Sequence, residues 1–231
     1  MRLIQSDHFC HTKTKYISVL PLPASIPPLV VEALAGIIAS HVFHLLSVLV
    51  LYGLAWELLP LEPSRRNDTA QMAAILHIIT PAGIFLSAPY AESACSLFNF
   101  SGMYLYCLAY HPRQRKTPSA PPSILIVASG ICFGLATTFR GNGILSGLIF
   151  VYEILSRFDT LWKDLTSLSR TWRAISFLIP MGIAGVSTAV GTVVPQFIAY
   201  REYCMSDTDA PRSWCAKIPP SIFTFVQEHY W

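Results

Sequence analysis

Charged residues are scarce in this sequence, and the few that occur are unevenly spaced. Aspartate, glutamate, lysine and arginine make up 13% of the 231 residues, whereas a soluble globular domain carries about 25%. Glu92 is the only charged residue between positions 69 and 112, and Arg140 is the only one between positions 117 and 152. Apolar stretches of this length exclude an ordinary soluble fold, a coiled coil and a disordered chain. They are typical of a protein that crosses a membrane several times, and the net charge of +3 gives no sign of a nucleic-acid partner.

Five apolar runs predict the segments that cross the membrane. The run 123–155 carries Arg140-Gly141-Asn142-Gly143 near its centre, so we expect it to enter the bilayer, turn there and return as a hairpin of two half-length helices. The sequence therefore predicts an all-α polytopic membrane protein with about six membrane segments over residues 29–200. Residues 1–28 precede this bundle and the tail 201–231 follows it. The five runs are 29–56, 70–88, 91–110, 123–155 and 174–200.

Basic residues in the loops orient these segments, because cytosolic loops carry an excess of lysine and arginine. If 123–155 is a hairpin, all three basic loops lie in the cytosol, and both chain ends, Glu92 and Arg140 lie on the opposite, lumenal face. The glycosylation sequon that begins at Asn67 is then cytosolic, and we expect it to be unused. The basic residues are Arg65, Arg66, Arg113, Arg115, Lys116, Arg157, Lys163, Arg170 and Arg173.

Glu92 and Arg140 are the main site candidates, because a charge at the bilayer centre costs about 2.5–3.5 kcal/mol on insertion scales. A guanidinium can hold a phosphate with two parallel hydrogen bonds. The structural alternatives are that Arg140 reaches the interface or pairs with Glu92, and that Glu92 complements a helix N-terminus. Asn142, between two glycines, suits either a ligand-binding turn or a plain one.

Several other polar residues have structural explanations. No carboxylate or cysteine stands at metal-ligand spacing from the three histidines His41, His44 and His77. We therefore expect these side chains to form helix–helix hydrogen bonds and to bind no metal. Tyr106 and Tyr110, with Tyr104, are interpreted as an aromatic belt at the interface. Cys204 and Cys215 follow the last apolar run and are disulfide candidates if the tail faces an oxidising lumen; otherwise both are free thiols.

Three stretches of the sequence resemble the PIG-V family, the second mannosyltransferase of glycosylphosphatidylinositol (GPI) anchor synthesis, in its fungal form. The first is Ile-Thr-Pro-Ala-Gly-Ile-Phe-Leu-Ser-Ala-Pro-Tyr-Ala-Glu-Ser over 79–93, and the second is Gly-Leu-Ala-Thr-Thr-Phe-Arg-Gly-Asn-Gly-Ile-Leu over 134–145. The third joins Trp214-Cys215 to Pro219-Pro220-Ser221-Ile222 and to the end of the chain, Phe-Val-Gln-Glu-His-Tyr-Trp over 225–231. The resemblance covers about residues 29–231.

The resemblance implies a GT-C glycosyltransferase bundle in the endoplasmic-reticulum (ER) membrane. Such an enzyme transfers mannose in α-1,6 linkage from dolichyl-phosphate mannose to the GPI precursor on the lumenal side. The resemblance implies no cofactor beyond this lipid donor and a small accessory membrane subunit as a partner; no metal ligands are predicted, and the sequence leaves open whether the reaction needs a metal. Arg140, Asn142 and Glu92 are then substrate-binding residues, as are His229, Tyr230 and Trp231 in the aromatic tail.

The family carries a Trp-Asp motif in its first lumenal loop, and its Asp is the expected base. Asp7 is the nearest counterpart here, and Glu92 is the other candidate for the base. The family also has Ser where Gly141 stands, and its chain continues beyond the His-Tyr-Trp segment. The resemblance therefore implies a partial chain that lacks both ends. The alternatives are an inactive fragment, a non-catalytic membrane subunit that binds dolichyl phosphate, and a small-solute transporter.

Overall fold

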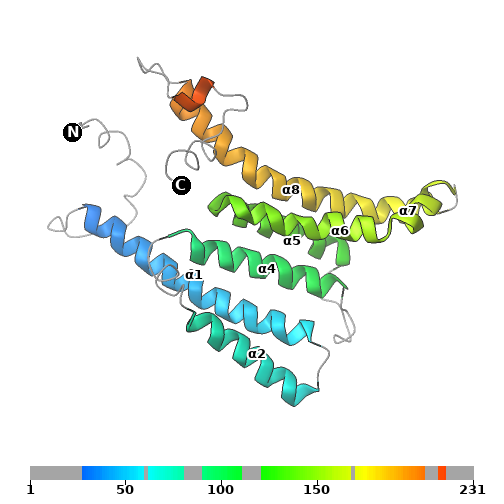
Figure 1. Ribbon diagram of the computed structural model, residues 1–231, viewed down its shortest axis with the longest axis horizontal. Coiled ribbons are helices and arrows are strands. Elements are labelled where there is room, and N and C mark those ends of the chain that lie inside the picture. Colours follow the sequence, from blue (N-terminus) through cyan, green and yellow to red (C-terminus); the bar gives the residue numbers. More distant parts are fainter. Residues whose placement is uncertain are drawn as a thin grey trace. The chain divides into compact units, whose positions relative to one another are not determined.

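The computed structural model describes residues 28–59, 62–80, 90–110, 121–167, 170–205 and 213–216. All regular structure in these ranges is helical (Figure 1), which confirms the all-α fold class. The α-helices are α1 (Pro28–Leu58), α2 (Pro63–Ile78), α4 (Glu92–Tyr110), α5 (Pro122–Phe139), α6 (Leu148–Ser156), α7 (Phe158–Leu165) and α8 (Thr171–Cys204); the 3-10 helices are η2 (Gly141–Gly147) and η3 (Ser213–Ala216).

Three helices in the described ranges are long and apolar enough to cross a membrane. They are Val30–Leu58, Pro122–Phe139 and Thr171–Cys204, and Gly141–Ser156 is a shorter apolar helix. Helix α4 has 19 residues, which is about 28 Å of helix and close to the thickness of a bilayer core. Leucine, isoleucine and valine side chains are exposed along α1 and α8, as expected where lipid replaces water. The chain is a membrane protein.

The apolar run 70–88 does not form one helix, contrary to the prediction. Helix α2 begins earlier, at Pro63, and ends at Ile78; residues 81–89 lie outside the described ranges. Proline fits the first helical position because its missing N–H has no intrahelical partner there. Helix α2 ends two residues before Thr80, which precedes Pro81, and a residue before proline disfavours helical dihedral angles.

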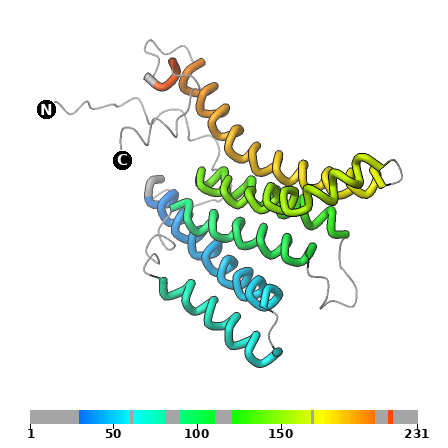
Figure 2. The backbone as a smooth tube through the Cα atoms, turned by 45° about the vertical axis from the view of Figure 1, so that its right-hand side comes forward, coloured from blue at the N-terminus to red at the C-terminus, as the bar shows by residue number. Residues whose placement is uncertain are grey.

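Helices α4, α5 and α8 pack side by side and form the core (Figures 1 and 2). Small residues let α5 and α8 approach closely: a Cβ on Gly191 would overlap the Gly134 carbonyl oxygen. Hydroxyl groups link the same helices, and Thr188 Oγ1 donates to the Gly130 carbonyl at 3.4 Å. Helix contacts in lipid depend on such close packing and on hydrogen bonds, because lipid tails are as apolar as the side chains.

The hairpin predicted over 123–155 is present, and it turns at Arg140. Helix α5 has 18 residues, or about 27 Å. The returning limb combines seven residues of η2 with nine of α6. A 3-10 helix rises about 2.0 Å per residue, so this shorter limb also extends about 27 Å. The prediction of two half-length helices is therefore wrong, because it took no account of the stretched 3-10 segment.

Candidate functional site

The end of α5 places Arg140 at the turn between two helices. Its N–H still donates to the Ala136 carbonyl at 2.9 Å, but its φ of −149° and ψ of 123° are extended, so the chain leaves the helix there. The Gly143 N–H then donates to the Arg140 carbonyl at 2.8 Å. A Cβ on Gly143 would lie 2.6 Å from the Thr137 backbone nitrogen. Only glycine therefore lets η2 fold back this closely on α5.

Arg140 forms an ion pair with Glu92. Its Nη1 donates to Glu92 Oε1 at 3.0 Å, and the two side chains are 52% and 28% exposed. Glu92 is the first residue of α4, where a carboxylate also complements the helix dipole. Stacked rings of Phe98 and Phe139, 5.7 Å apart, join α4 to the end of α5. The structure thus contains the pairing that the sequence offered as the structural alternative.

The ion pair leaves Arg140 capacity for a ligand. A guanidinium has five N–H donors, and among the described residues the Arg140 guanidinium makes one hydrogen bond, the one to Glu92. Half of its side chain is exposed. The pair can therefore present a fixed cation to an anionic group while Glu92 holds the guanidinium in place.

Further polar contacts run from this pair along α4 and the returning limb. Ser146 Oγ donates to Asn99 Oδ1 at 2.6 Å, and the Tyr106 hydroxyl donates to Glu153 Oε2 at 3.3 Å. The sequence separations are 48, 47 and 47 residues, counting the Arg140–Glu92 pair. A nearly constant separation means that the two segments run in the same direction and stay in register to within one residue. We call these three contacts the polar ladder.

Sequence reasoning missed the polar ladder, although a signal was present. Glu92, Asn99 and Tyr106 are seven residues apart, which places them on one face of a helix. The sequence predicts Tyr106 in an interfacial belt with Tyr104 and Tyr110. The structure corrects this assignment: the Tyr106 ring lies against Tyr110 and Phe150, with ring centroids 4.7 and 6.1 Å apart. A tyrosine can be drawn inward where a half-buried carboxylate, here that of Glu153, accepts its hydroxyl hydrogen.

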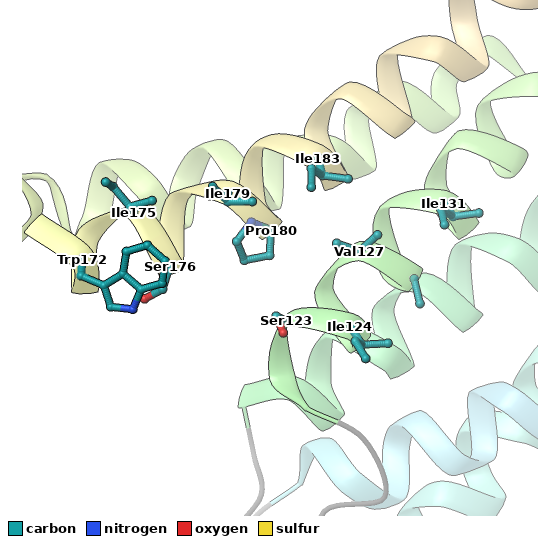
Figure 3. Close-up of a pocket in the computed structure, with 11 residues that line it drawn as sticks. Ser123, Ile124, Val127, Ile131, Trp172, Ile175, Ser176, Ile179, Pro180 and Ile183 are labelled. Atoms are coloured by element: carbon teal, nitrogen blue, oxygen red, sulfur yellow. The ribbon is translucent and has the colours of Figure 1, made fainter.

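Two apolar cavities flank the core. One, of about 390 Å³, lies beside the polar ladder between α1, α4 and α6, and its lining includes Leu54, Leu58, Asn99, Met103, Tyr106 and Ile149. The other is a groove of about 460 Å³ between α5 and α8. It opens where the two helices diverge, between Ser123 of α5 and Trp172 of α8, with Pro180 pointing into the gap (Figure 3). Both cavities have the chemistry of sites for apolar chains.

The remaining predicted site residues do not join this pair in the described structure. Asn142 is exposed in η2, one residue after Gly141. Asp7, His229, Tyr230 and Trp231 lie outside the described residues. The described residues contain no group of three or more His, Cys, Asp or Glu that could hold a metal ion.

His44 of α1 and His77 of α2 lie at the contact between these helices, whereas His41 Nδ1 lies 2.8 Å from the Ile37 carbonyl oxygen of its own helix. The His44 and His77 rings lie 5.2 Å apart, and His77 Nε2 is 3.1 Å from Ser47 Oγ. The Ser47 hydroxyl donates to the His44 carbonyl at 2.8 Å. The predicted role in helix–helix contacts is therefore met by His44 and His77 and not by His41.

Cys204 and Cys215, the candidate disulfide pair, are bonded to each other, with Cα atoms 5.6 Å apart. The bond ties η3 back to the end of α8. Trp214, next to Cys215, is buried. Helix α8 runs in the same direction as α5, since Trp172 faces Ser123 and Gly191 faces Gly134. The disulfide therefore lies beyond the end of the bundle that carries Arg140.

Fold and site together define the class: a polytopic helical membrane protein with an open arginine–glutamate pair at one end of its bundle and cavities for apolar chains. Comparison with known families identifies the member of this class. A family model described as "Mannosyltransferase (PIG-V)" matches residues 15–231, so the chain belongs to the PIG-V mannosyltransferase family.

Curated relatives carry the name GPI mannosyltransferase 2. The protein from Chaetomium globosum is 37% identical over 94% of this chain and 48% of its own length. The protein from Aspergillus fumigatus is 38% identical over 81% of this chain and 41% of its own length, and that from Schizosaccharomyces pombe is 28% identical over 84% and 36%. The chain thus spans about half the length of the curated relatives it matches. No solved structure matches the chain.

Proposed function

We propose that this chain contributes the membrane core of a mannosyltransferase that adds the second mannose, in α-1,6 linkage, to the GPI precursor. The donor is dolichyl-phosphate mannose, the reaction takes place on the lumenal side of the ER membrane, and a small accessory membrane subunit assists. The observation that carries the proposal is the Arg140–Glu92 pair, 3.0 Å between charged atoms, at one end of a lipid-facing bundle. Family membership supplies the substrate class.

The reaction is a single displacement. The acceptor hydroxyl gives its proton to a carboxylate base, and its oxygen forms a bond to C1 of mannose. The bond from C1 to the phosphate oxygen breaks, and dolichyl phosphate leaves with the electron pair. This inverts the β-linked donor to the α-linked product. Donors already in position stabilise the charge that develops on the leaving phosphate.

Arg140 is the residue that we assign to the phosphate. Its remaining N–H groups suit two parallel bonds to phosphate oxygens. Glu92 was a candidate for the base, but its Oε1 accepts from Arg140, so we assign it as a positioning residue. Asp7 remains the sequence candidate for the base. The apolar cavities suit substrates that arrive as lipids.

The test compares Arg140→Lys with Arg157→Lys. Both arginines are paired with a glutamate, at 3.0 and 2.6 Å, but Arg157 lies at the opposite end of the bundle. Mannose transfer from dolichyl-phosphate mannose is measured in microsomes from a host that lacks this activity. We expect Arg140→Lys to lose about 100-fold in rate, as for other lost transition-state donors, with expression unchanged, and Arg157→Lys to stay near normal. Near-normal transfer by Arg140→Lys would refute the phosphate role.

A hybrid protein tests whether transfer needs the sequence that the curated relatives have beyond the part matched by this chain. The assay is run on this chain alone and on the chain extended with the remaining sequence of the Chaetomium globosum relative. Transfer by either supports the function. Lack of transfer by both, with dolichyl phosphate still bound, would overturn it in favour of a non-catalytic lipid-binding subunit.

A further inference from the structure

Helix α7 differs from the other helices in length and position. It has eight residues, Phe158–Leu165, and lies between the end of α6 and the start of α8 (Figure 1). It follows Arg157, whose φ of −109° and ψ of 10° interrupt the helix. This end of the bundle is opposite Arg140, because the returning limb has run the length of α5 by then.

One face of α7 is anchored to the protein. Leu161 and Asp164 are both buried, and α7 packs against α8. Asp164 Oδ1 also pairs with Arg170 Nε at 3.5 Å, just before α8 begins. The orientation of α7 is therefore fixed, and its other faces point away from α8.

The outward face of α7 is aromatic and apolar. Phe158, Trp162 and Leu165 are exposed, with Trp162 61% exposed, and their spacing of four and three residues aligns them on one side of the helix. The Phe158 and Trp162 rings stack with centroids 6.1 Å apart. Trp172, at the start of α8, is 77% exposed. A stripe of this kind marks an interaction surface.

Basic residues outnumber acidic ones in the sequence that carries this stripe, although Asp159 is also exposed. Residues 157–173 carry four basic side chains and two acidic ones. Asp164 is buried and paired with Arg170, whereas Lys163 and Arg173 are exposed. An apolar stripe flanked by lysine and arginine, at the level where membrane helices end, matches the boundary between lipid head groups and acyl chains.

We propose that α7 is an interfacial helix that binds the cytosolic leaflet of the membrane. Phe158, Trp162 and Leu165 lie at the boundary of the acyl chains, and Lys163 and Arg173 contact the phosphates of anionic phospholipids. We assign α7 to the cytosolic side because the loops at this end of the bundle are rich in lysine and arginine, as cytosolic loops are. The proposal does not depend on mannosyl transfer.

Fluorescence quenching tests the position of Trp162. The chain is placed in nanodiscs of phosphatidylcholine and phosphatidylserine, and the signal of Trp162 is obtained by subtracting the spectrum of Trp162→Phe, a mild change. We expect lipids brominated near the head group to quench this signal strongly, and lipids brominated at the chain end and aqueous acrylamide to quench it weakly. Quenching mainly by acrylamide would refute the proposal, as would quenching by none of the three, which would indicate a second copy or another protein segment covering the stripe.

A thermal-shift measurement tests the proposed contact of Lys163 and Arg173 with anionic phospholipids. In detergent, added phosphatidylserine should raise the melting temperature more than phosphatidylcholine does. The double variant Lys163→Glu, Arg173→Glu should lose this difference, whereas the control Lys163→Arg should keep it. Equal stabilisation of the unaltered chain by both lipids would overturn the assignment to anionic phospholipids.

Discussion

Gly191 shows how much a single residue without a side chain contributes here. It lies in the middle of α8 and faces the Gly134 carbonyl of α5 so closely that a Cβ would overlap the oxygen. Glycine usually weakens a helix interior by about 0.5–1 kcal/mol relative to alanine. At this position close packing of the backbones offsets that cost, because dispersion contacts and hydrogen bonds hold helices together in lipid.

We therefore predict opposite effects for two glycine-to-alanine changes in α8. Gly191→Ala should destabilise the protein by about 1–3 kcal/mol, the usual cost of overpacking. Gly182→Ala should leave stability unchanged or slightly raised, because no described atom lies within 4 Å of the added Cβ and alanine favours the helix. The melting temperature in detergent measures both. Equal melting temperatures for the two variants would contradict the packing of α5 on α8 described above.

Gly141 and Gly143 provide a similar contrast at the scale of an element, the turn between α5 and η2. A Cβ on Gly143 would meet the backbone of Ala136 and Thr137, whereas no described atom lies within 4 Å of one on Gly141. The space around Gly141 also suits a serine, the residue that the resemblance leads us to expect there. The close approach at Gly143 holds η2 in place and, through it, Arg140.

If the proposed function holds, Gly143→Ala should displace η2 and reduce mannose transfer at least as strongly as Arg140→Lys, with a lower melting temperature. Gly141→Ala should keep both properties near those of the unaltered chain. The microsomal transfer assay and the melting temperature in detergent measure the pair. If Gly143→Ala transfers normally, the turn does not control the position of Arg140.

The elements also show where sequence reasoning succeeded and failed. The hairpin over 123–155 was predictable, because only a return through the membrane brings the basic loops to one side. The length of its second limb was not, since apolarity does not distinguish a 3-10 helix from an α-helix. The start of α2 at Pro63 was missed for a related reason: an apolar run marks the part in lipid, and polar residues such as Asn67 can extend the helix beyond it.

At the scale of the whole molecule, charge separates the two ends of the bundle. Asn67, near the start of α2, accepts a hydrogen bond from Tyr52 at 2.9 Å, and Arg66 lies over the Trp56 ring at 5.5 Å. This start of α2 therefore lies at the end of α1, the same end as Tyr110 and Arg157. The Arg140–Glu92 pair and the disulfide lie at the other end. An oxidising lumen favours a disulfide, which supports the proposed orientation.

Labelling in sealed microsomes tests this orientation. A membrane-impermeant maleimide should label Lys163→Cys directly and Asn142→Cys only after permeabilisation; both native side chains are exposed. The chain without added cysteine controls for Cys95, Cys107 and Cys132, which are free thiols. The orientation would be wrong if the labelling pattern were reversed or if Asn67 carried a glycan.

The sequence by itself determined that this is a helical membrane protein, and its word-for-word motifs indicated the PIG-V family, because hydropathy, loop charge and short motifs are local properties of a chain. It also singled out Glu92 and Arg140, since isolated charges in apolar surroundings are conspicuous. Only the tertiary structure decided that these two residues pair, that Asn99 and Ser146 continue the contact, and that Tyr106 turns inward. Such contacts join residues about 47 positions apart, and they depend on the rotation and register of packed helices, which are set by close contacts of small residues.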